Sequence, residues 1–140
     1  MKLLIDANIL LDVLQQRAPH YKYSSIVWKL CETAQVEGYV SVLTFMNMTY
    51  ILRKHLTPQK IEELYNTLSL IFTFTDLTQK DVASAAELRL KDFEDAAQIK
   101  TAERIGADYI ITRNIKDFND CSIPAFTPED FVKFKILNQQ

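Results

Sequence analysis

Polar side chains directly follow three short apolar runs of the sequence. In a folded sheet, these side chains could lie together at one edge and form a site for catalysis or binding. Each run predicts a buried strand, and the carboxyl ends of parallel strands meet at one edge, where ligands gather. A fourth segment, the predicted start of a helix, adds further acids. We expect all four segments to share one cleft, which would then contain Asp6, Asn8, Asn47, Asp92, Glu94, Asp95, Thr112, Arg113, Asn114 and Asp117.

Several carboxylates in one cleft repel each other unless one stays protonated or a cation holds them together. Ligands that are all oxygen favour a hard ion, Mg²⁺ or Mn²⁺. Such an ion polarises a phosphoryl oxygen, lowers the pKa of water and stabilises a leaving oxygen. The donor set therefore predicts metal-dependent chemistry on phosphodiesters.

Most of these residues also have a structural interpretation, which the sequence leaves open. Asp6 is placed to cap a helix, and Asn114 after a strand is typical of a turn. Asp92 and Asp95 have the spacing of a capping box, although the third residue of a helix can still face a cleft. Asp117 fits a solvated loop as well as a metal site.

The composition limits the class of protein. The chain has 140 residues, 48% hydrophobic and 24% charged, which predicts one globular domain over residues 1–140. Its formal net charge is −2, so it is not a strongly basic protein that coats nucleic acid. Its two glycines are too few for a P-loop or a GxGxxG fingerprint. Cys31 and Cys121 favour free thiols in a reducing cytosol, and no apolar window predicts a signal peptide or a membrane span.

The chain alternates between predicted strands and predicted helices, which indicates an α/β fold with a central, mainly parallel sheet of four to five strands flanked by helices. The strands are expected at 2–5, 39–43, 71–75, 108–112 and 123–126. The helices are expected at 7–14, 21–37, 45–54, 58–70, 79–90 and 92–106, with a last one after Thr127. Helix caps are also predicted: Gly38 closes the second helix, and Thr44, Thr57, Thr78 and Asp92 each open one of the helices that follow.

Three stretches resemble the PIN-domain family, and most closely its small VapC-like toxins. They are LIDANILLDVL (4–14), SVLTFMNMTYIL (41–52) and DFEDAAQIKTAERIGADYIITRNIKDF (92–118). The resemblance implies a three-layer fold and a metal-dependent ribonuclease, with four acidic positions around one or two Mg²⁺ or Mn²⁺ ions. It also implies a homodimer and, for many members, a cognate antitoxin.

Two of the four family acids are amides in this chain. By position, the first acid is Asp6 and the third is Asp95, whereas the second and fourth fall on Asn47 and Asn114. We expect these four residues to form the catalytic set. An amide oxygen can bind a hard cation but contributes no negative charge.

Neighbouring residues are expected to complete the site. Asp92 and Asp117 each lie three residues from an aligned position, so we expect them to supply the missing charge to a metal held by Asp6 and Asp95. Asn8 and Thr112 match accessory polar positions of the family, and Arg113 stands next to the site. We assign Asn8, Thr112 and Arg113 to binding of the RNA substrate.

Two other hypotheses assign the chain to a functional class other than nuclease. A PIN fold that binds without cleaving is favoured by Asn47 and Asn114. A phosphoryl-accepting Asp6 is the weakest, because haloacid-type phosphatases need a second Asp where Asn8 stands. The expected partners are RNA, an antitoxin and a second copy of the chain, the last through the helix that carries Trp28 or through the helix 58–70. The expected location is the cytoplasm.

Overall fold

Five short strands form one parallel sheet in the computed structural model, which describes residues 1–119 and 121–138. The strand order is β3-β2-β1-β4-β5, so the first strand of the chain lies at the centre. The strands are β1 (Lys2–Ile5), β2 (Glu37–Ser41), β3 (Thr73–Thr75), β4 (Tyr109–Ile111) and β5 (Ala125–Phe126). The predicted α/β fold with a parallel sheet is confirmed.

Side chains of β1 alternate between the two faces of the sheet. Leu4 pairs with Tyr39 of β2 and with Ile110 of β4, and it packs with the core on one face. Leu3 and Ile5 pack with the core on the other face. All three leucine and isoleucine side chains are fully buried, as expected for a parallel strand that is covered on both faces.

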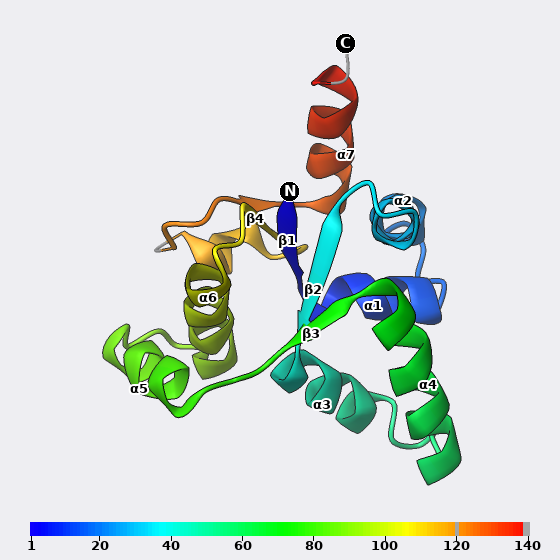
Figure 1. Cartoon of the computed structure of the whole chain (residues 1–140), viewed down its shortest axis with the longest axis horizontal. Helices are drawn as coiled ribbons and strands as arrows, with labels where there is room; N and C mark the ends of the chain where they lie inside the picture. The colour runs from blue at the N-terminus through cyan, green and yellow to red at the C-terminus, as the bar shows by residue number, and fades with distance from the viewer. Residues whose placement is uncertain (120, 139–140) are drawn as a thin grey trace.

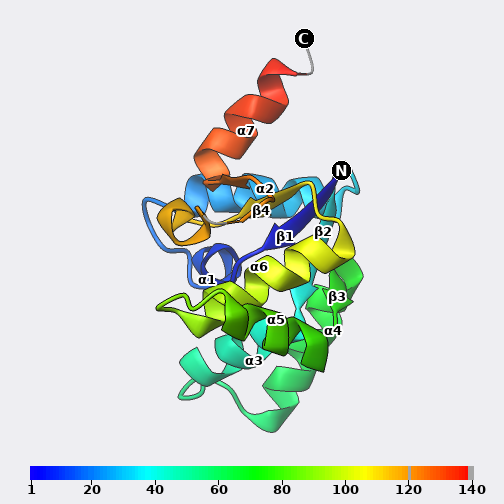
Figure 2. The same cartoon turned by 90° about the vertical axis from the view of Figure 1, so that its left-hand side faces the viewer.

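Helices cover both faces of the sheet and give three layers (Figure 1). Helices α5 (Gln79–Glu87) and α6 (Phe93–Ile105) lie on one face, in front of the strands in Figure 2. The other face is covered by α1 (Ala7–Leu14), α2 (Tyr21–Glu32) and α4 (Pro58–Ile71), with α3 (Val42–Ile51) and α7 (Pro128–Leu137) beside them. Within residues 1–119 and 121–138, no helix is long and apolar enough to cross a membrane.

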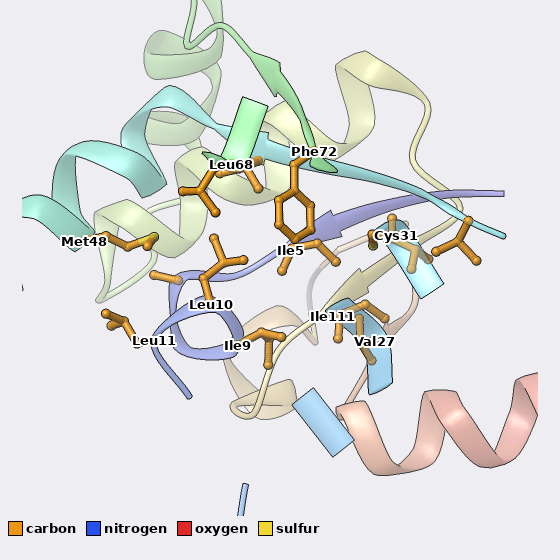
Figure 3. Close-up of a cluster of buried hydrophobic side chains, with 14 of the residues drawn as sticks. Ile5, Ile9, Leu10, Leu11, Val27, Cys31, Met48, Leu68, Phe72 and Ile111 are labelled. Atoms are coloured by element: carbon orange, nitrogen blue, oxygen red, sulfur yellow. The ribbon is translucent and has the colours of Figure 1, made fainter. Parts of the chain in front are cut away.

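The larger core fills the space between the sheet and the helices α1, α2 and α4 (Figure 3). Ile5 and Ile111 contribute from the sheet, and Leu10, Val27 and Leu68 contribute from the three helices. On the opposite face, alanines let the helices approach closely. Burial of this apolar area, at roughly 25 cal/mol per Å², is the main force that fixes β1 and β4 beside each other.

The predicted end of the second helix is wrong. Helix α2 ends at Glu32, and the chain turns through Ala34, whose φ of 57° is left-handed, before β2 begins at Glu37. Gly38 therefore lies inside a strand and does not cap a helix. The left-handed conformation that the C-cap rule assigned to glycine occurs at an alanine instead.

Gly38 is needed for close packing inside β2. A Cβ at this position would lie 2.6 Å from Sγ of Cys31 and 2.8 Å from Cδ1 of Phe72, closer than van der Waals contact allows. The glycine lets α2 and the end of α4 approach the sheet, which is a recognised role of glycine in strands. At the other glycine, Gly106, φ is +67° and the residue does end α6, as predicted.

The predicted cap at Thr44 is also wrong. The Ser41 hydroxyl accepts a hydrogen bond from the Leu43 backbone N–H at 3.1 Å, so α3 begins at Val42. Thr44 is fully buried, and its hydroxyl accepts a hydrogen bond from the side chain of Gln98 on α6. Side-chain caps are present at Asp6, Thr57, Thr78, Asp92 and Thr127, whereas His20 precedes α2 without a capping hydrogen bond from its side chain.

Both cysteines are free thiols, as the sequence favours. Cys31 is buried on α2, and this burial raises the pKa of its thiol to about 12. Cys121 is half-buried, and its pKa is also raised by burial. Burial therefore disfavours the reactive thiolate form at both positions.

Candidate active site

An open cavity of about 350 Å³ lies where β1 and β4 end. The four predicted segments meet there, because the carboxyl ends of adjacent parallel strands lie at the same edge. Its lining includes most of the predicted residues, namely Asp6, Asn8, Asn47, Asp92, Asp95, Asn114 and Asp117. Tyr50 and Ile51 of α3 complete the wall with Glu94.

Two hydrogen bonds fix the carboxylate of Asp6. Its Oδ1 accepts the backbone N–H of Ala7 at 2.8 Å, and its Oδ2 accepts the hydroxyl of Thr112 at 2.8 Å. The side chain is 8% exposed. Burial raises the pKa of Asp6, although the two hydrogen bonds oppose the rise; the Asp92 charge adds to it and Arg113 lowers it. Asp6 is thus held rigidly at the rim of the cavity.

Thr112 connects the ends of β1 and β4. It is fully buried, its hydroxyl donates to Asp6, and its oxygen accepts the backbone N–H of Asn114 at 3.1 Å. The structure therefore places the Thr112 hydroxyl on Asp6 and the Asn114 backbone, not in the open cavity. Its observed part is to orient Asp6.

Helix α6 begins at the cavity. Asp92 caps it by accepting the backbone N–H of Asp95 at 3.1 Å, and the described residues contain no reciprocal bond to the Asp95 carboxylate. Asp95 is free to face the cavity, as the sequence suggested. Burial, and then the charges of Asp92, Asp6, Asp117 and Glu94, raises its pKa to about 7.

Glu94 belongs to the same acidic group, although the sequence ranked it below Asp92 and Asp117. Burial raises its pKa, the Asn47 amide opposes the rise, and the charges of Asp6 and Asp92 add to it. In the described part of the chain, the buried Nδ2 of Asn47 has no well-formed hydrogen bond. The proximity of Asn47 to Glu94 depends on how α3 packs beside α6. This packing could not be predicted from the pattern of residues in the sequence.

The chemical type of the donor atoms in this cavity, all of them oxygen, fits a hard cation. All the polar side chains that line the cavity offer oxygen, and the pKa of Asp95 is raised by burial and then by the negative charges around it. In the described residues, however, no three His, Cys, Asp or Glu side chains stand close enough to hold a metal ion. With side chains in these positions, fewer than three of the acids could bind one ion together.

A larger open groove of about 680 Å³ continues from this cavity. It shares Asp92, Asp95 and Asp117 with the cavity and adds Lys91 and Lys116. Asp117 lies in the short 3₁₀ helix Ile115–Phe118 that follows β4. The groove thus carries two cations beside the acids, which suits a polyanion that passes over the site.

Arg113 is not brought into the acidic cavity. Its Nε lies 3.3 Å from Oδ2 of Asp12, a fully buried residue of α1. The side chain lines a different cavity, beside Ser24 of α2. The sequence position of Arg113, next to Asn114, gave no sign of this separation.

Comparison with known proteins agrees with the fold. The model of the PIN domain family matches residues 2–116. A ribonuclease named VapC1 from Aquifex aeolicus (strain VF5) is 27% identical over 139 residues, covering 93% of this chain and 92% of the relative.

Solved structures resemble the chain as a whole. A toxin–antitoxin complex from Klebsiella pneumoniae contains a chain that is 25% identical, with a TM-score of 0.67 over 90% of this chain and 97% of the other. VapBC2 from Rickettsia felis, bound to a DNA fragment from its promoter, is 15% identical with a TM-score of 0.68, over 91% and 98% of the two chains. At that identity the likeness concerns the fold alone.

Proposed function

This chain belongs to the PIN domain family, and from this premise we propose that it is a metal-dependent endoribonuclease and the toxin of a toxin–antitoxin pair. The observation that carries the proposal is the meeting of acids from separate segments in one cavity, where burial and then the neighbouring negative charges raise the pKa of Asp95 to about 7. The similarity to a ribonuclease over nearly the whole chain supports RNA as the substrate.

Asp6 and Asp95 would hold a Mg²⁺ or Mn²⁺ ion, with the amide oxygens of Asn47 and Asn114 beside them. A bound ion of this kind stabilises negative charge on a phosphate and lowers the pKa of water. The chain itself contributes orientation, because the two hydrogen bonds to Asp6 keep its carboxylate in place before any ligand arrives. Asn8 contacts substrate at the edge of the cavity.

Further acids and cations surround this set. Asp92 and Asp117 add negative charge near the ion, which compensates for the two amides. Lys91 and Lys116 line the adjoining groove, where they would bind phosphates of the RNA on either side of the site. Because the net charge of the chain is −2, RNA would be attracted by the local positive charge of Lys91 and Lys116 and not by the overall charge.

A binding module without activity is the second candidate. It is favoured by Asn47 and Asn114 and by the finding that no three acids form a group within the described residues. In such a protein the cavity would bind RNA or a partner without hydrolysis. Metal binding separates the two candidates.

The proposed partners are a cognate antitoxin and a second copy of this chain, in the cytoplasm. Relatives of known structure that form toxin–antitoxin complexes support the antitoxin. Exposed apolar side chains on α3 support the homodimer: Met46 is 64% exposed and Tyr50 is 66% exposed, one helical turn apart. Trp28 is half-buried against Phe72, so α2 offers less apolar surface than the sequence suggested.

Cleavage of single-stranded RNA in the presence of Mn²⁺ tests the proposed function. The wild-type chain should cleave, EDTA should stop cleavage, and Asp6→Asn and Asp95→Asn should each lose at least about tenfold in rate. Glu62→Gln, which removes one exposed acid from α4 away from the cavity, is the matched control and should cleave like the wild type. Activity that both site variants retain would assign the cleavage to another site.

A further inference from the structure

A second cavity, of about 470 Å³, lies where the amino ends of α2 and α7 meet the loop after β4. Figure 2 shows α2, α7 and β4 next to one another, away from α3. Pro19, Tyr23 and Pro128 give this cavity apolar walls, and Lys22 and Arg113 add positive charge. Its size suits a small organic ligand.

A buried ion pair anchors Arg113 in this cavity. Oδ2 of Asp12, a residue with no exposed surface, accepts the Ser24 hydroxyl at 3.0 Å and lies 3.3 Å from Nε of Arg113. Burying a carboxylate in this way costs desolvation energy, so the ion pair contributes little net stability to the fold. It does keep the Nε side of the guanidinium beside Asp12, although this nitrogen makes no well-formed hydrogen bond in the described part of the chain.

The free end of Arg113 can bind an anion. Within residues 1–119 and 121–138, no hydrogen bond engages its two terminal amino groups. A guanidinium held at one nitrogen still presents the planar pair of donors that binds a phosphate in two places. The anchored arginine is thus prepared for a phosphate in the second cavity.

The charges around this cavity leave a positive excess. Glu129 also lines the cavity, but it pairs with Lys133 at 2.9 Å, and Arg113 pairs with Asp12. Lys22 makes no ion pair in the described part of the chain, and its ammonium lies 5.2 Å from the ring centre of Tyr23. Lys22 therefore supplies the uncompensated charge. His20 completes the polar lining.

Consecutive residues of the loop after β4 line the two cavities. Asn114 lines the acidic cavity and Arg113 lines the second, so their Cα atoms are about 3.8 Å apart. An RNA strand that lies across this loop would place neighbouring phosphates over the two cavities. The loop after β4 thus separates a site for cleavage from a site for binding.

We propose that the second cavity binds the nucleotide next to the cleaved phosphate, with its base against Pro19, Tyr23 and Pro128 and its phosphate on Arg113 and Lys22. This inference rests on the proposed ribonuclease function. It assigns Arg113 to a site beyond the acidic cavity, and it gives the buried Asp12 and Ser24 the part of anchoring that arginine.

Binding of a short, fluorescein-labelled single-stranded RNA, followed by fluorescence anisotropy in EDTA, tests the inference without cleavage. Each phosphate contact on a single strand contributes about 0.7 to the slope of log K against log salt concentration. Lys22→Ala should reduce the slope by about that amount. Lys29→Ala, on the same helix and with a side chain that is 69% exposed, should leave it unchanged.

The apolar wall has its own matched pair of variants. Tyr23→Leu should weaken RNA binding by at least about fivefold, the lower end for loss of one base–aromatic contact. Tyr21→Leu removes an exposed ring from the same helix outside the cavity and should bind like the wild type. Circular dichroism of each variant establishes that it is folded.

The outcomes separate this inference from the proposed function. A wild-type salt slope for Lys22→Ala with wild-type affinity for Tyr23→Leu would overturn the second cavity as a nucleotide site, even if the chain cleaves RNA. Absence of RNA binding in EDTA would overturn it too. If both variants behave as expected in a chain that cleaves no RNA, the binding site stands and the nuclease proposal fails.

Discussion

Thr112 decides how Asp6 presents its carboxylate to the cavity. Its hydroxyl is one of two donors to a carboxylate that is 8% exposed, so the loss of this donor leaves a buried oxygen without a partner. The sequence could suggest that Thr112 and Asp6 lie close together, since each follows one of two strands. It could not show that Thr112 faces Asp6 and not the solvent.

Thr112→Val should destabilise the protein by about 1–3 kcal/mol, because the valine fills the same space but donates no hydrogen bond. Urea denaturation measures the change in the free energy of unfolding. Thr112→Ser keeps the hydroxyl and is the control, expected to lose less. Unchanged stability in Thr112→Val would mean that the hydrogen bond to Asp6 does not stabilise the fold.

Asp95 gives the metal-free protein a dependence on pH. Its pKa is about 7 when folded and near 3.8 when unfolded, so the folded state keeps the proton more strongly. This contribution to stability is full below pH 3.8 and is lost as the pH rises to about 7. Because asparagine does not titrate, Asp95→Asn avoids the loss.

In EDTA, the stability advantage of Asp95→Asn over the wild type should therefore grow between about pH 4 and pH 7 and level off above that range. Thermal unfolding of both proteins across this range measures the difference. The comparison cancels the titration of all other groups that the two proteins share. An advantage independent of pH would show that neither burial nor the neighbouring charges raise the pKa of Asp95 in the folded protein.

Arg113 illustrates what residue types and spacing leave undetermined. Its neighbour Asn114 faces the acidic cavity, whereas Arg113 turns to Asp12, which is far away in the sequence. One signal was present: Asp12 follows Ile9 by three residues, on the apolar side of a short helix. A carboxylate in that position needs a buried partner, and an arginine is the usual one.

At the scale of elements, the order of strands and helices followed from the sequence, but some of their ends did not. Apolar runs identified every strand, and polar residues before helices identified most caps. Gly38 was misplaced because the rule for helix ends competed with the rule for close approach in strands. Only the packing of α2 and Phe72 against β2 distinguishes the two.

Gly38→Ala should destabilise the protein by about 1–3 kcal/mol, the usual cost of overpacking a core. The new methyl would press on Cys31 and Phe72 and force α2 away from the sheet. Urea denaturation measures this change as well. Gly38→Ala in a Cys31→Ala background should recover part of the loss relative to Cys31→Ala alone, and an undiminished loss would contradict the close contact with the sulfur.

At the scale of the whole molecule, the exposed apolar side chains of α3 lie beside the acidic cavity, because Tyr50 lines the cavity and Met46 is its neighbour one turn earlier. A second copy bound to α3 would therefore extend the walls of the cavity. The sequence pointed to α2 or α4 for this contact. The sequence could not distinguish α2 and α4 from α3, because the exposure of a side chain depends on which face of its helix packs against the rest of the protein.

Met46→Glu should convert the proposed homodimer to a monomer, since a charge at the centre of an apolar contact stays unpaired. Sedimentation velocity measures the molecular mass in solution. Leu70→Glu places the same charge on α4, at a residue that is 90% exposed, and should leave the dimer intact. A monomer in the Leu70 variant alone would move the interface to α4.

The proposed ribonuclease activity depends above all on one divalent ion shared by Asp6 and Asp95. Calorimetric titration of the metal-free protein with Mn²⁺ tests this most directly, with Glu62→Gln as the matched loss of one acid. The wild type and Glu62→Gln should bind Mn²⁺ with equal affinity, and Asp6→Asn and Asp95→Asn should each bind at least about tenfold more weakly. No binding at millimolar Mn²⁺, or wild-type affinity in both site variants, would contradict the account.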